Sequence, residues 1–325
     1  MSADRHQVIE HVKCRLCGSS ELQAVFSVGN QYINDFVPEE RVGQGLRAPL
    51  DLVMCKTCSL IQLKHTAPQE LLYSRFYWYR SGVTDTMRRA LRDVSAAIES
   101  MVDLKEGDVV LDIGANDGTL LDTYTVPGLK RVGCEPADNL VDMCREKTPY
   151  VMHDFWLYDS YMRHAQEWGF GKAKVITALG MFYDLEEPNQ FIGDAAKALD
   201  EDGIFVAQLM CLGSMLDKND LGNICHEHIE YYSLASLKYL FENNGLEIFK
   251  MEENDVNGGS YRIFARHFKQ GSIPLQENIT LDDLHAFKAR LDDNRQKCVD
   301  FIKAEVAKGK KVYVYGASTK GNVIL

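Results

Sequence analysis

The chain has 325 residues, of which 46% are hydrophobic and 26% are charged, and its formal net charge is −11. This acidic balance argues against general binding to nucleic acids or anionic membranes, because such binding needs a basic face. No apolar run approaches the roughly 18 residues of a membrane helix, and the first residues lack the apolar core of a signal peptide. We therefore expect a cytoplasmic globular protein of one or two domains, without a nucleic-acid or membrane partner.

Four of the nine cysteines form two CxxC pairs, Cys14 with Cys17 and Cys55 with Cys58. In a reducing compartment, cysteines are more often metal ligands or core residues than disulfides. Two such pairs can close a tetrahedral thiolate site around one structural zinc ion, which would stabilise a small domain over residues 1–66. Redox-active or simply buried cysteines are the alternative.

Aromatic residues crowd the next segment, at Tyr73, Phe76, Tyr77, Trp78 and Tyr79. Helical spacing could make them ordinary core packing. Because these rings stand so close together that they cannot all face one way, we expect some of them to line a cleft or a seam between domains.

Residues 110–118 read VLDIGANDG, which predicts the end of a buried strand, a glycine-containing turn and the start of a helix. Glycines in this turn let a ligand approach the backbone, and acceptor side chains lie at the carboxyl end of the strand, where open α/β sheets bind ligands. Glu135 ends the next strand, where a carboxylate can accept hydrogen bonds from both hydroxyls of a ribose. We therefore predict a nucleotide-cofactor pocket. The turn residues expected to take part are Asp112, Gly114, Asn116, Asp117 and Gly118.

The turn has the spacing GxxxG, whereas a dinucleotide site prefers GxGxxG, so that helix amides reach a pyrophosphate. Its carboxylate and amide side chains repel phosphate and suit a cation. S-adenosylmethionine fits this pocket, because it has an adenosine, an ammonium and a sulfonium but no phosphate. After the third strand, Asp154 and Phe155 are placed to meet the amino group and the ring face of an adenine; an ordinary helix cap and a core ring are the alternative. A nicotinamide oxidoreductase, or a turn that binds nothing, would use the same sheet.

Short apolar runs alternate with amphipathic stretches from residue 109 to about residue 267, as in a doubly wound sheet. Strands are predicted at residues 109–113, 131–134, 150–153, 173–178, 203–209, 246–252 and 261–266. A helix should begin near Ser233 and end by Gly245. After Gly271 we expect a linker, a helix over residues 281–308, a strand over 311–315 and the turn GASTKGN. A unit that begins so late cannot bury its own core, so we expect either a truncated chain or a piece that docks elsewhere.

The segment 225–232 reads CHEHIEYY and lies beyond the fifth strand, at the same edge of the sheet as the glycine turn. In His226, Glu227 and His228, two imidazoles flank a carboxylate and form a general acid/base set whose charge states can change near neutral pH. A second zinc site is a competing interpretation, but the two histidines lack the i, i+4 spacing that puts both on one helical face. The other competing interpretation is a surface polar cluster without a function.

A turn between the last two strands contains Asn257, Gly258, Gly259 and Ser260. Its free amides and hydroxyl could hold a polar substrate, and Arg262 follows as a candidate phosphate partner. A simple hairpin turn is the alternative.

Several motifs occur in the order seen in zinc-containing sugar C-methyltransferases, which methylate carbon 3 of nucleotide-linked 4-keto-deoxysugars: CRLCG with the second CxxC, YWYRSG, VLDIGANDG, CHEHIEYYS, DVNGGSYR and VYVYGASTKGN. The chain resembles this family over nearly its whole length. The resemblance implies an α/β class I methyltransferase fold, with a Rossmann-like doubly wound sheet, over residues 67–270. It also implies S-adenosylmethionine as cofactor, an N-terminal zinc-binding domain, and the start of a C-terminal α/β domain in residues 271–325. We expect a monomer or a homodimer that acts on a nucleotide-linked ketosugar.

In such a reaction a base removes the proton next to the ketone, the enolate is stabilised, and the carbanion displaces the methyl group from the sulfonium. The resemblance places the acid/base residues at His226, Glu227 and His228, with His228 as the expected base. It places a catalytic tyrosine at Tyr79, with Tyr77 as the near alternative. The expected substrate contacts are Tyr77, Asp184, Asn257, Ser260 and Arg262.

Three positions depart from the better-known members of the family. Cys225 stands where they carry a tyrosine, Tyr183 or Asp184 where they carry a histidine, and Asn257 where they carry another histidine. These departures bear on which group handles which proton and on the identity of the sugar. Methylation of oxygen or nitrogen in a small metabolite, and a non-catalytic binding protein on the same fold, are the alternatives to carbon methylation.

Overall fold

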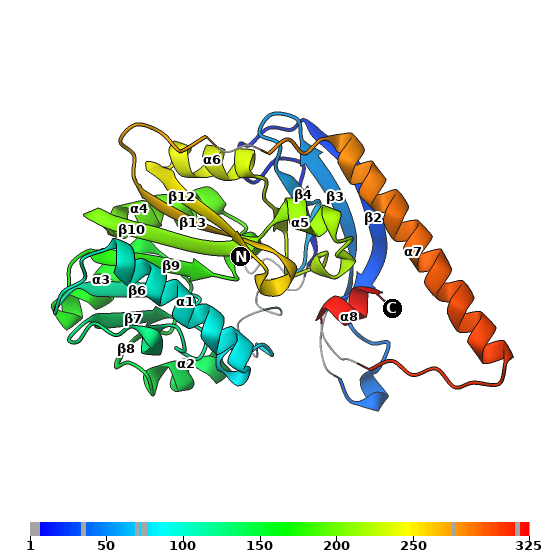
Figure 1. Ribbon diagram of the computed structural model, residues 1–325, viewed down its shortest axis with the longest axis horizontal. Coiled ribbons are helices and arrows are strands. Elements are labelled where there is room, and N and C mark those ends of the chain that lie inside the picture. The colour runs from blue at the N-terminus through cyan, green and yellow to red at the C-terminus, as the bar shows by residue number, and fades with distance from the viewer. Residues whose placement is uncertain are drawn as a thin grey trace.

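The computed structural model describes residues 7–33, 37–68, 72, 77–274, 277–315 and 319–324. Tyr73 and Phe76 of the aromatic segment lie outside these residues. The described strands form a seven-stranded, a four-stranded and a two-stranded sheet, with helices packed around them (Figure 1). In these ranges, no helix combines the length and the apolar composition that crossing a membrane requires.

The large sheet has the strand order β12-β13-β10-β9-β6-β7-β8. Its strands are β6 (Val109–Ile113), β7 (Lys130–Cys134), β8 (Tyr150–Met152), β9 (Ala173–Leu179), β10 (Leu199–Met210), β12 (Leu246–Asn254) and β13 (Ser260–His267). Strands β6 to β10 are parallel, while β13 pairs antiparallel with both β10 and β12. All seven predicted strands are present, and the carboxyl ends of the parallel strands lie at one edge, where such sheets bind ligands.

Helices cover both faces of the large sheet, because its parallel strands are hydrophobic on both sides. Along β6, Val109, Leu111 and Ile113 pack in one core and Val110 packs in the other, as alternating side chains of a strand should. The first core contains α3 (Tyr158–Trp168), α4 (Pro188–Ala198) and α6 (Leu234–Asn243), and the second contains α1 (Asp85–Met101) and α2 (Asp138–Arg145). This is the doubly wound arrangement that the sequence predicts.

The four-stranded sheet joins segments that are far apart in the sequence. In the order β11-β4-β3-β2, its strands are β2 (Leu22–Tyr32), β3 (Arg47–Cys55), β4 (Ile61–Leu63) and β11 (Glu230–Tyr231). Near its start the chain forms the two-stranded sheet, in which β1 (Ile9–Glu10) pairs with β5 (His65–Thr66). Strand β11 pairs with β4, and the Leu63 N–H donates to the Ile229 carbonyl at 2.8 Å. The N-terminal unit predicted over residues 1–66 therefore completes its sheet with a strand from the opposite end of the methyltransferase-like region.

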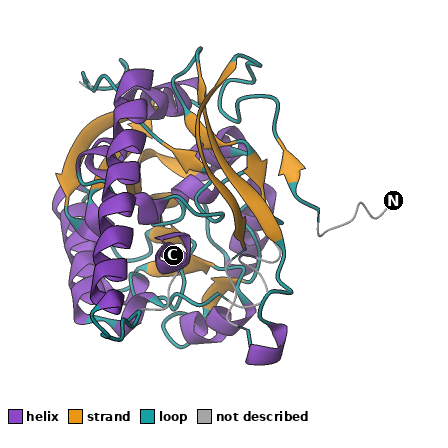
Figure 2. Cartoon of the chain, turned by 90° about the vertical axis from the view of Figure 1, so that its right-hand side faces the viewer, coloured by secondary structure: helices purple, strands orange, loops and turns teal. Residues whose placement is uncertain are grey.

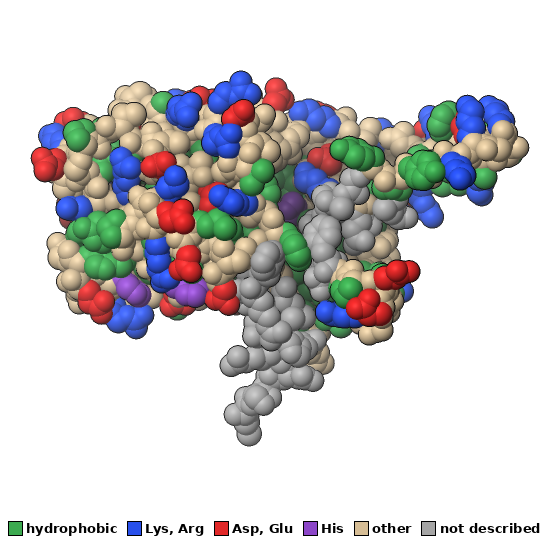
Figure 3. All heavy atoms as spheres, turned by 90° about the horizontal axis from the view of Figure 1, so that it is seen from below, with side chains coloured by type: hydrophobic (Ala, Val, Ile, Leu, Met, Phe, Trp, Pro, Cys, Tyr) green, Lys and Arg blue, Asp and Glu red, His purple; other side chains and the backbone are tan. Residues whose placement is uncertain are grey.

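The long helix α7 (Leu281–Ala307) lies where it is predicted, but only its first half is packed. Leu284, Phe287 and Leu291 are buried, and the Phe287 ring lies 6.1 Å from the ring of Phe26 in β2. This half also contacts the short helix α5 (Leu212–Asp217). Farther along, Phe301 is 67% exposed, and the second half of α7 extends away from the body of the molecule (Figures 1 and 3).

The strand predicted over residues 311–315 is wrong, because this segment is exposed and has no regular secondary structure. A strand needs a neighbour to pair its backbone N–H and C=O groups, and the described residues supply none here. The predicted GASTKGN turn ends in the helix α8 (Thr319–Ile324), and residues 316–318 lie outside the described ranges. Helix α8 packs against the 3-10 helix Leu221–Asn223 and lies near the centre of the view in Figure 2.

Candidate active site

A cavity of about 1130 Å³ opens at the carboxyl edge of the large sheet. It is lined by parts of three segments: the glycine turn (residues 114–118), the aromatic segment (residues 73–79) and the HEH segment (residues 226–228). The predicted site residues on its wall are Tyr77, Tyr79, Gly114, Asn116, Glu135, Phe155, Asp184, Glu227, His228, Asn257 and Ser260. The candidate cofactor residues and the candidate base therefore open into one common space.

Glu135 lies at the cofactor end of this cavity and organises the glycine turn. Its Oε2 accepts from the Asn116 N–H at 2.7 Å, and its Oε1 accepts from the Ala137 N–H at 2.8 Å. Burial raises the pKa of Glu135, while these two amides lower it. Each carboxylate oxygen has a second lone pair, so Glu135 can still accept hydrogen bonds from ribose hydroxyls.

Gly114 is required for the backbone at the end of β6. Its φ is +74°, and a Cβ placed there would lie 3.0 Å from the Met181 Cγ. Asp112, two residues before it in β6, accepts from the Thr177 hydroxyl at 2.6 Å, and burial raises its pKa to about 7. Asp112 is not on the cavity wall, so its place is beneath the turn rather than against a ligand.

Asp117, Gly118 and Asp154 also lie off the cavity wall. The carboxylate of Asp154 accepts from the Phe155 N–H at 2.8 Å and from the Ser160 hydroxyl of α3 at 3.2 Å. Asp154 thus bonds to its own chain near the start of α3, whose N-cap residue is Leu157, whereas Phe155 does reach the cavity. A Cβ on Gly118 would lie 3.1 Å from Lys147, so this glycine serves the packing of the turn.

The aromatic segment is anchored on the glycine turn through its backbone. Asn116 accepts from the Ser81 N–H at 2.9 Å and donates to the Tyr79 carbonyl at 3.1 Å. Asp117 accepts from the Gly82 N–H at 2.9 Å. These bonds explain why acidic and amide side chains follow Gly114: they hold one wall of the cavity against the end of β6.

Both candidate tyrosines line the cavity, but they meet different charges. The pKa of Tyr77 is raised by burial and by nearby Asp184 and Glu227. The pKa of Tyr79 is raised by burial and by Asp117 of the glycine turn. Glu135 also raises the pKa of Tyr77, so Tyr77 lies near acids of both ends of the cavity, whereas Tyr79, the first choice from the sequence, lies near Asp117.

His228 is held in one tautomer. Its Nδ1 lies 2.9 Å from the Asn223 carbonyl, which can only accept, so Nδ1 carries the hydrogen and the lone pair of Nε2 is free in the neutral ring. Burial, together with the smaller effect of the charge of Lys320, lowers the pKa of His228 to about 4, although the hydrogen bond to Asn223 raises it. The ring packs edge-on against Tyr183 at 4.5 Å. His228 is thus a neutral imidazole that can accept a proton.

His226 lies away from the cavity, contrary to its expected place in an acid/base set. It is buried, and its Nε2 donates to the Ala48 carbonyl of β3 at 3.0 Å. Residues 226 and 227 form a turn before β11, in which the His228 N–H donates to the Cys225 carbonyl at 3.2 Å. Glu227 and His228 reach the cavity wall, while His226 joins the HEH segment to the four-stranded sheet.

Arg262 is also held elsewhere. It pairs across the sheet with Gln208, and its Nε donates to the Gln208 Oε1 at 2.9 Å. Its guanidinium lies 3.7 Å from Glu252 and away from the cavity wall. The predicted contact with a phosphate is therefore not supported, whereas Asn257 and Ser260 of the same turn do line the cavity.

Lys320 is a cavity residue that the sequence analysis missed. It comes from α8, and its Nζ donates to the Asn223 side-chain carbonyl at 2.5 Å and lies 3.9 Å from Asp220. Asn223 thus holds Lys320 with its side chain and His228 with its backbone carbonyl. Nothing in the spacing of the sequence links residue 320 to residue 223.

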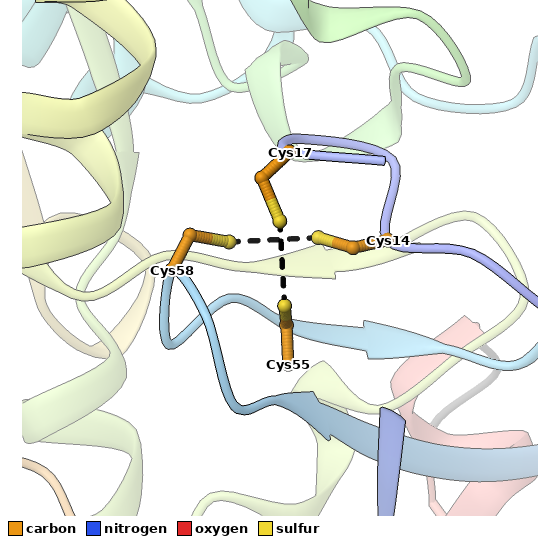
Figure 4. Close-up of side chains that lie close together, drawn as sticks. All are labelled: Cys14, Cys17, Cys55 and Cys58. Carbon is orange, nitrogen blue, oxygen red and sulfur yellow. Dashed lines mark hydrogen bonds between the residues drawn. The ribbon is translucent and has the colours of Figure 1, made fainter. Parts of the chain in front are cut away.

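The four predicted zinc ligands form one cluster (Figure 4). The sulfurs of Cys14, Cys17, Cys55 and Cys58 lie within 4.8 Å of one another, with Cys14 to Cys58 and Cys17 to Cys55 at 3.5 Å. A tetrahedron with Zn–S bonds of about 2.3 Å has edges near 3.8 Å, so these thiols fit zinc. No other such group of ligands occurs within the ranges that the structure describes.

Comparisons with known proteins agree with this layout. A family model described as a methyltransferase domain matches residues 83–250, a zinc binding domain matches residues 14–73, and a C-methyltransferase C-terminal domain matches residues 255–325. The C-methyltransferase NovU of Streptomyces niveus is 27% identical over 327 residues, which cover 96% of this chain and 77% of that protein.

Two solved structures are similar to part of this chain. Magnesium protoporphyrin IX methyltransferase ChlM from Synechocystis PCC 6803, with bound SAH, is 16% identical, with a TM-score of 0.43 over 59% of this chain and 90% of that chain. An S-adenosylmethionine-dependent methyltransferase from Clostridium acetobutylicum ATCC 824 is 11% identical, with a TM-score of 0.42 over 57% and 93% of the two chains.

Proposed function

We propose that this chain, which belongs to the S-adenosylmethionine-dependent C-methyltransferases, methylates the carbon next to the ketone of a nucleotide-linked 4-keto-deoxysugar. One observation carries the proposal: the glycine turn with Glu135 and the neutral imidazole of His228 line the same cavity. A base on one side of a substrate and a methyl donor on the other is the arrangement that methylation of an acidic C–H requires.

The chain's own residues fit the adenosine end of the cofactor. Glu135 has lone pairs for the ribose hydroxyls, and Phe155 offers an apolar ring on the cavity wall. Bound S-adenosylmethionine supplies an electrophilic methyl group. Its cationic end suits a cavity that Glu186 and Glu227 also line.

At the substrate end, His228 Nε2 takes the proton from the carbon next to the ketone. The Asn223 carbonyl keeps the hydrogen on Nδ1, so this base needs no rearrangement before it acts. Because the pKa of His228 is low, at about 4, the imidazole is a weak base, and proton removal depends on stabilising the enolate oxygen that forms. Besides His228, we assign Tyr77, which also lines the cavity, to the substrate end.

The size and charge of the cavity support a nucleotide-linked sugar. About 1130 Å³ exceeds the usual range for a single small ligand, roughly 300–1,000 Å³, so a cofactor and a second molecule can both fit. Lys320 supplies a cation that can pair with a diphosphate, and Asn257 and Ser260 supply groups for sugar hydroxyls. The nine free cysteines, four of them in a zinc site, fit a reducing compartment such as the cytoplasm.

The proposal is tested with purified protein, S-adenosylmethionine and a thymidine diphosphate-linked 4-keto-deoxysugar. We expect mass spectrometry to detect one added methyl group and NMR to locate it on the carbon next to the ketone. In deuterated water without methyl donor, the same protein should exchange that carbon's hydrogen. Methylation of oxygen or nitrogen, or tight binding of NAD with none of S-adenosylmethionine, would overturn the proposal.

A further inference from the structure

Asp184 is a buried acid on the cavity wall that the proton transfer described above leaves unused. It ends the 3-10 helix Phe182–Asp184, which follows β9 at the carboxyl edge of the sheet. Its Oδ1 is buried and has no hydrogen-bond partner among the described residues. A buried oxygen without a partner costs free energy, so a site that keeps one is expected to fill it with a ligand.

The segment around Asp184 is fixed against the candidate base. The Ile229 N–H donates to the Tyr183 carbonyl at 3.0 Å, and the Tyr183 ring lies 4.5 Å from the His228 ring. These two contacts, one from the His228 ring and one from the backbone of Ile229, hold the 3-10 helix against the HEH segment. Asp184 and His228 therefore both line the cavity, and Tyr183, the residue before Asp184, is in contact with the His228 ring.

The surroundings of Asp184 favour its neutral form. Burial raises its pKa well above the ordinary value, and nearby Glu227 and Glu230 raise it further. The titratable groups that interact with it are all acids, namely Tyr77, Tyr183, Cys225, Glu227, Glu230 and Tyr231. A neutral carboxyl group has one O–H donor, which an ionised one lacks.

We propose that Asp184 donates its carboxylic O–H to the ketone oxygen of the substrate and so stabilises the enolate that His228 generates. This inference rests on the proposed function, because it needs a ketone beside the carbon that loses its proton. It makes Asp184 a catalytic residue, whereas the sequence analysis places it only among the substrate contacts.

Each bond, electron pair and proton in this step is accounted for. His228 Nε2 takes the proton from the carbon, and the electrons of that C–H bond form the carbon–carbon double bond. The π electrons of the ketone move to its oxygen, which receives the hydrogen bond or the proton of Asp184. In the exchange reaction, the carbon takes back a hydrogen from His228 after that site has exchanged with solvent, the oxygen regains its double bond and the proton returns to Asp184. In methyl transfer, the carbon instead bonds to the methyl group, the sulfur keeps the electrons of the broken S–C bond as a neutral thioether, and His228 releases its proton to solvent.

The test measures hydrogen exchange next to the ketone in deuterated water, with the thymidine diphosphate-linked 4-keto-deoxysugar and without methyl donor. Removing one donor to a developing oxyanion typically slows a reaction about 100-fold to 1,000-fold, and we expect this loss for Asp184→Ala. Asp184→Asn keeps an N–H donor of similar shape, so its loss should be smaller. Asp159→Asn, the same change at an exposed carboxylate of α3, should exchange at the wild-type rate.

The pH profile separates donation by a neutral acid from a structural role. Wild-type exchange should fall at alkaline pH as Asp184 ionises, and this fall should disappear in Asp184→Asn, because an amide does not ionise. Binding of S-adenosylhomocysteine and the melting temperature show whether each variant is folded. If Asp184→Ala does not fold, the pH dependence of exchange in Asp184→Asn shows whether Asp184 acts as a neutral donor.

Two outcomes would overturn the inference while leaving the proposed function intact. In the first, Asp184→Ala exchanges at the wild-type rate. In the second, Asp184→Asn keeps the alkaline fall. A wild-type protein that binds S-adenosylhomocysteine but exchanges no hydrogen would instead refute the proposed function itself, and this inference with it.

Discussion

Replacing Glu135 with alanine tests the cofactor site most directly. In the structure, this carboxylate holds two backbone amides, at 2.7 and 2.8 Å, and keeps lone pairs for a ribose. Alanine removes the acceptor for the ribose hydroxyls and releases the Asn116 amide that shapes the glycine turn. Loss of hydrogen bonds to a charged group costs about 1–3 kcal/mol, which corresponds to a roughly 5-fold to 150-fold weaker affinity.

The assay is calorimetric titration with S-adenosylhomocysteine. Glu135→Gln keeps one carbonyl acceptor and should lie between wild type and Glu135→Ala. Glu146→Ala, an exposed acid just after α2 and outside the cavity, is the matched control and should bind normally. The melting temperature of each unliganded variant shows whether the turn itself is disturbed. Affinity of Glu135→Ala within twofold of wild type would refute the assignment of Glu135 to the ribose.

Three further predictions concern the base and the zinc site. His228→Asn should abolish hydrogen exchange and methyl transfer while S-adenosylhomocysteine still binds; full activity would move the base elsewhere. The pKa of His228 in the folded chain, about 4, lies below its value in the unfolded chain, about 6.5. As the pH falls, the unfolded chain therefore binds the proton first, and the free energy of unfolding decreases between pH 6.5 and pH 4. The difference in melting temperature between wild type and His228→Asn should therefore change between pH 6.5 and pH 4. A constant difference would contradict the lowered pKa of His228. Cys14→Ser should lower zinc content, measured by atomic absorption, and lower the melting temperature; unchanged zinc content would contradict the four-cysteine site.

The large sheet was predictable because its pattern is local. Four of the five residues Val109–Ile113 are hydrophobic, which indicates a strand covered on both faces, and the glycine turn and Glu135 follow at spacings that a parallel sheet fixes. The cysteine pairs were predictable for a similar reason, since the CxxC spacing itself sets the geometry of two thiolates.

The parts that could not be predicted depend on distant contacts. Strand β11 is only two residues long, too short to show an alternating pattern, and its partner β4 comes from residues 61–63. His226 lies away from the cavity because its ring is bonded to the Ala48 carbonyl of β3, 178 positions away in the sequence. The charge of Arg262 suggests a phosphate partner, but its register opposite Gln208 lets its guanidinium bond to that side chain instead. Lys320 reaches Asn223 across 97 positions of the chain, and no local spacing indicates such a contact.

The sharing of β11 between the two parts of the molecule has a consequence for their evolution and engineering. Glu230 and Tyr231 belong by sequence to the catalytic region, yet they form the edge of the cysteine-bearing sheet. A cut at residue 67 would leave β4 without this neighbour and expose an open strand edge to other molecules. A chimera that exchanges the N-terminal unit between relatives must therefore transplant Glu230 and Tyr231 together with it.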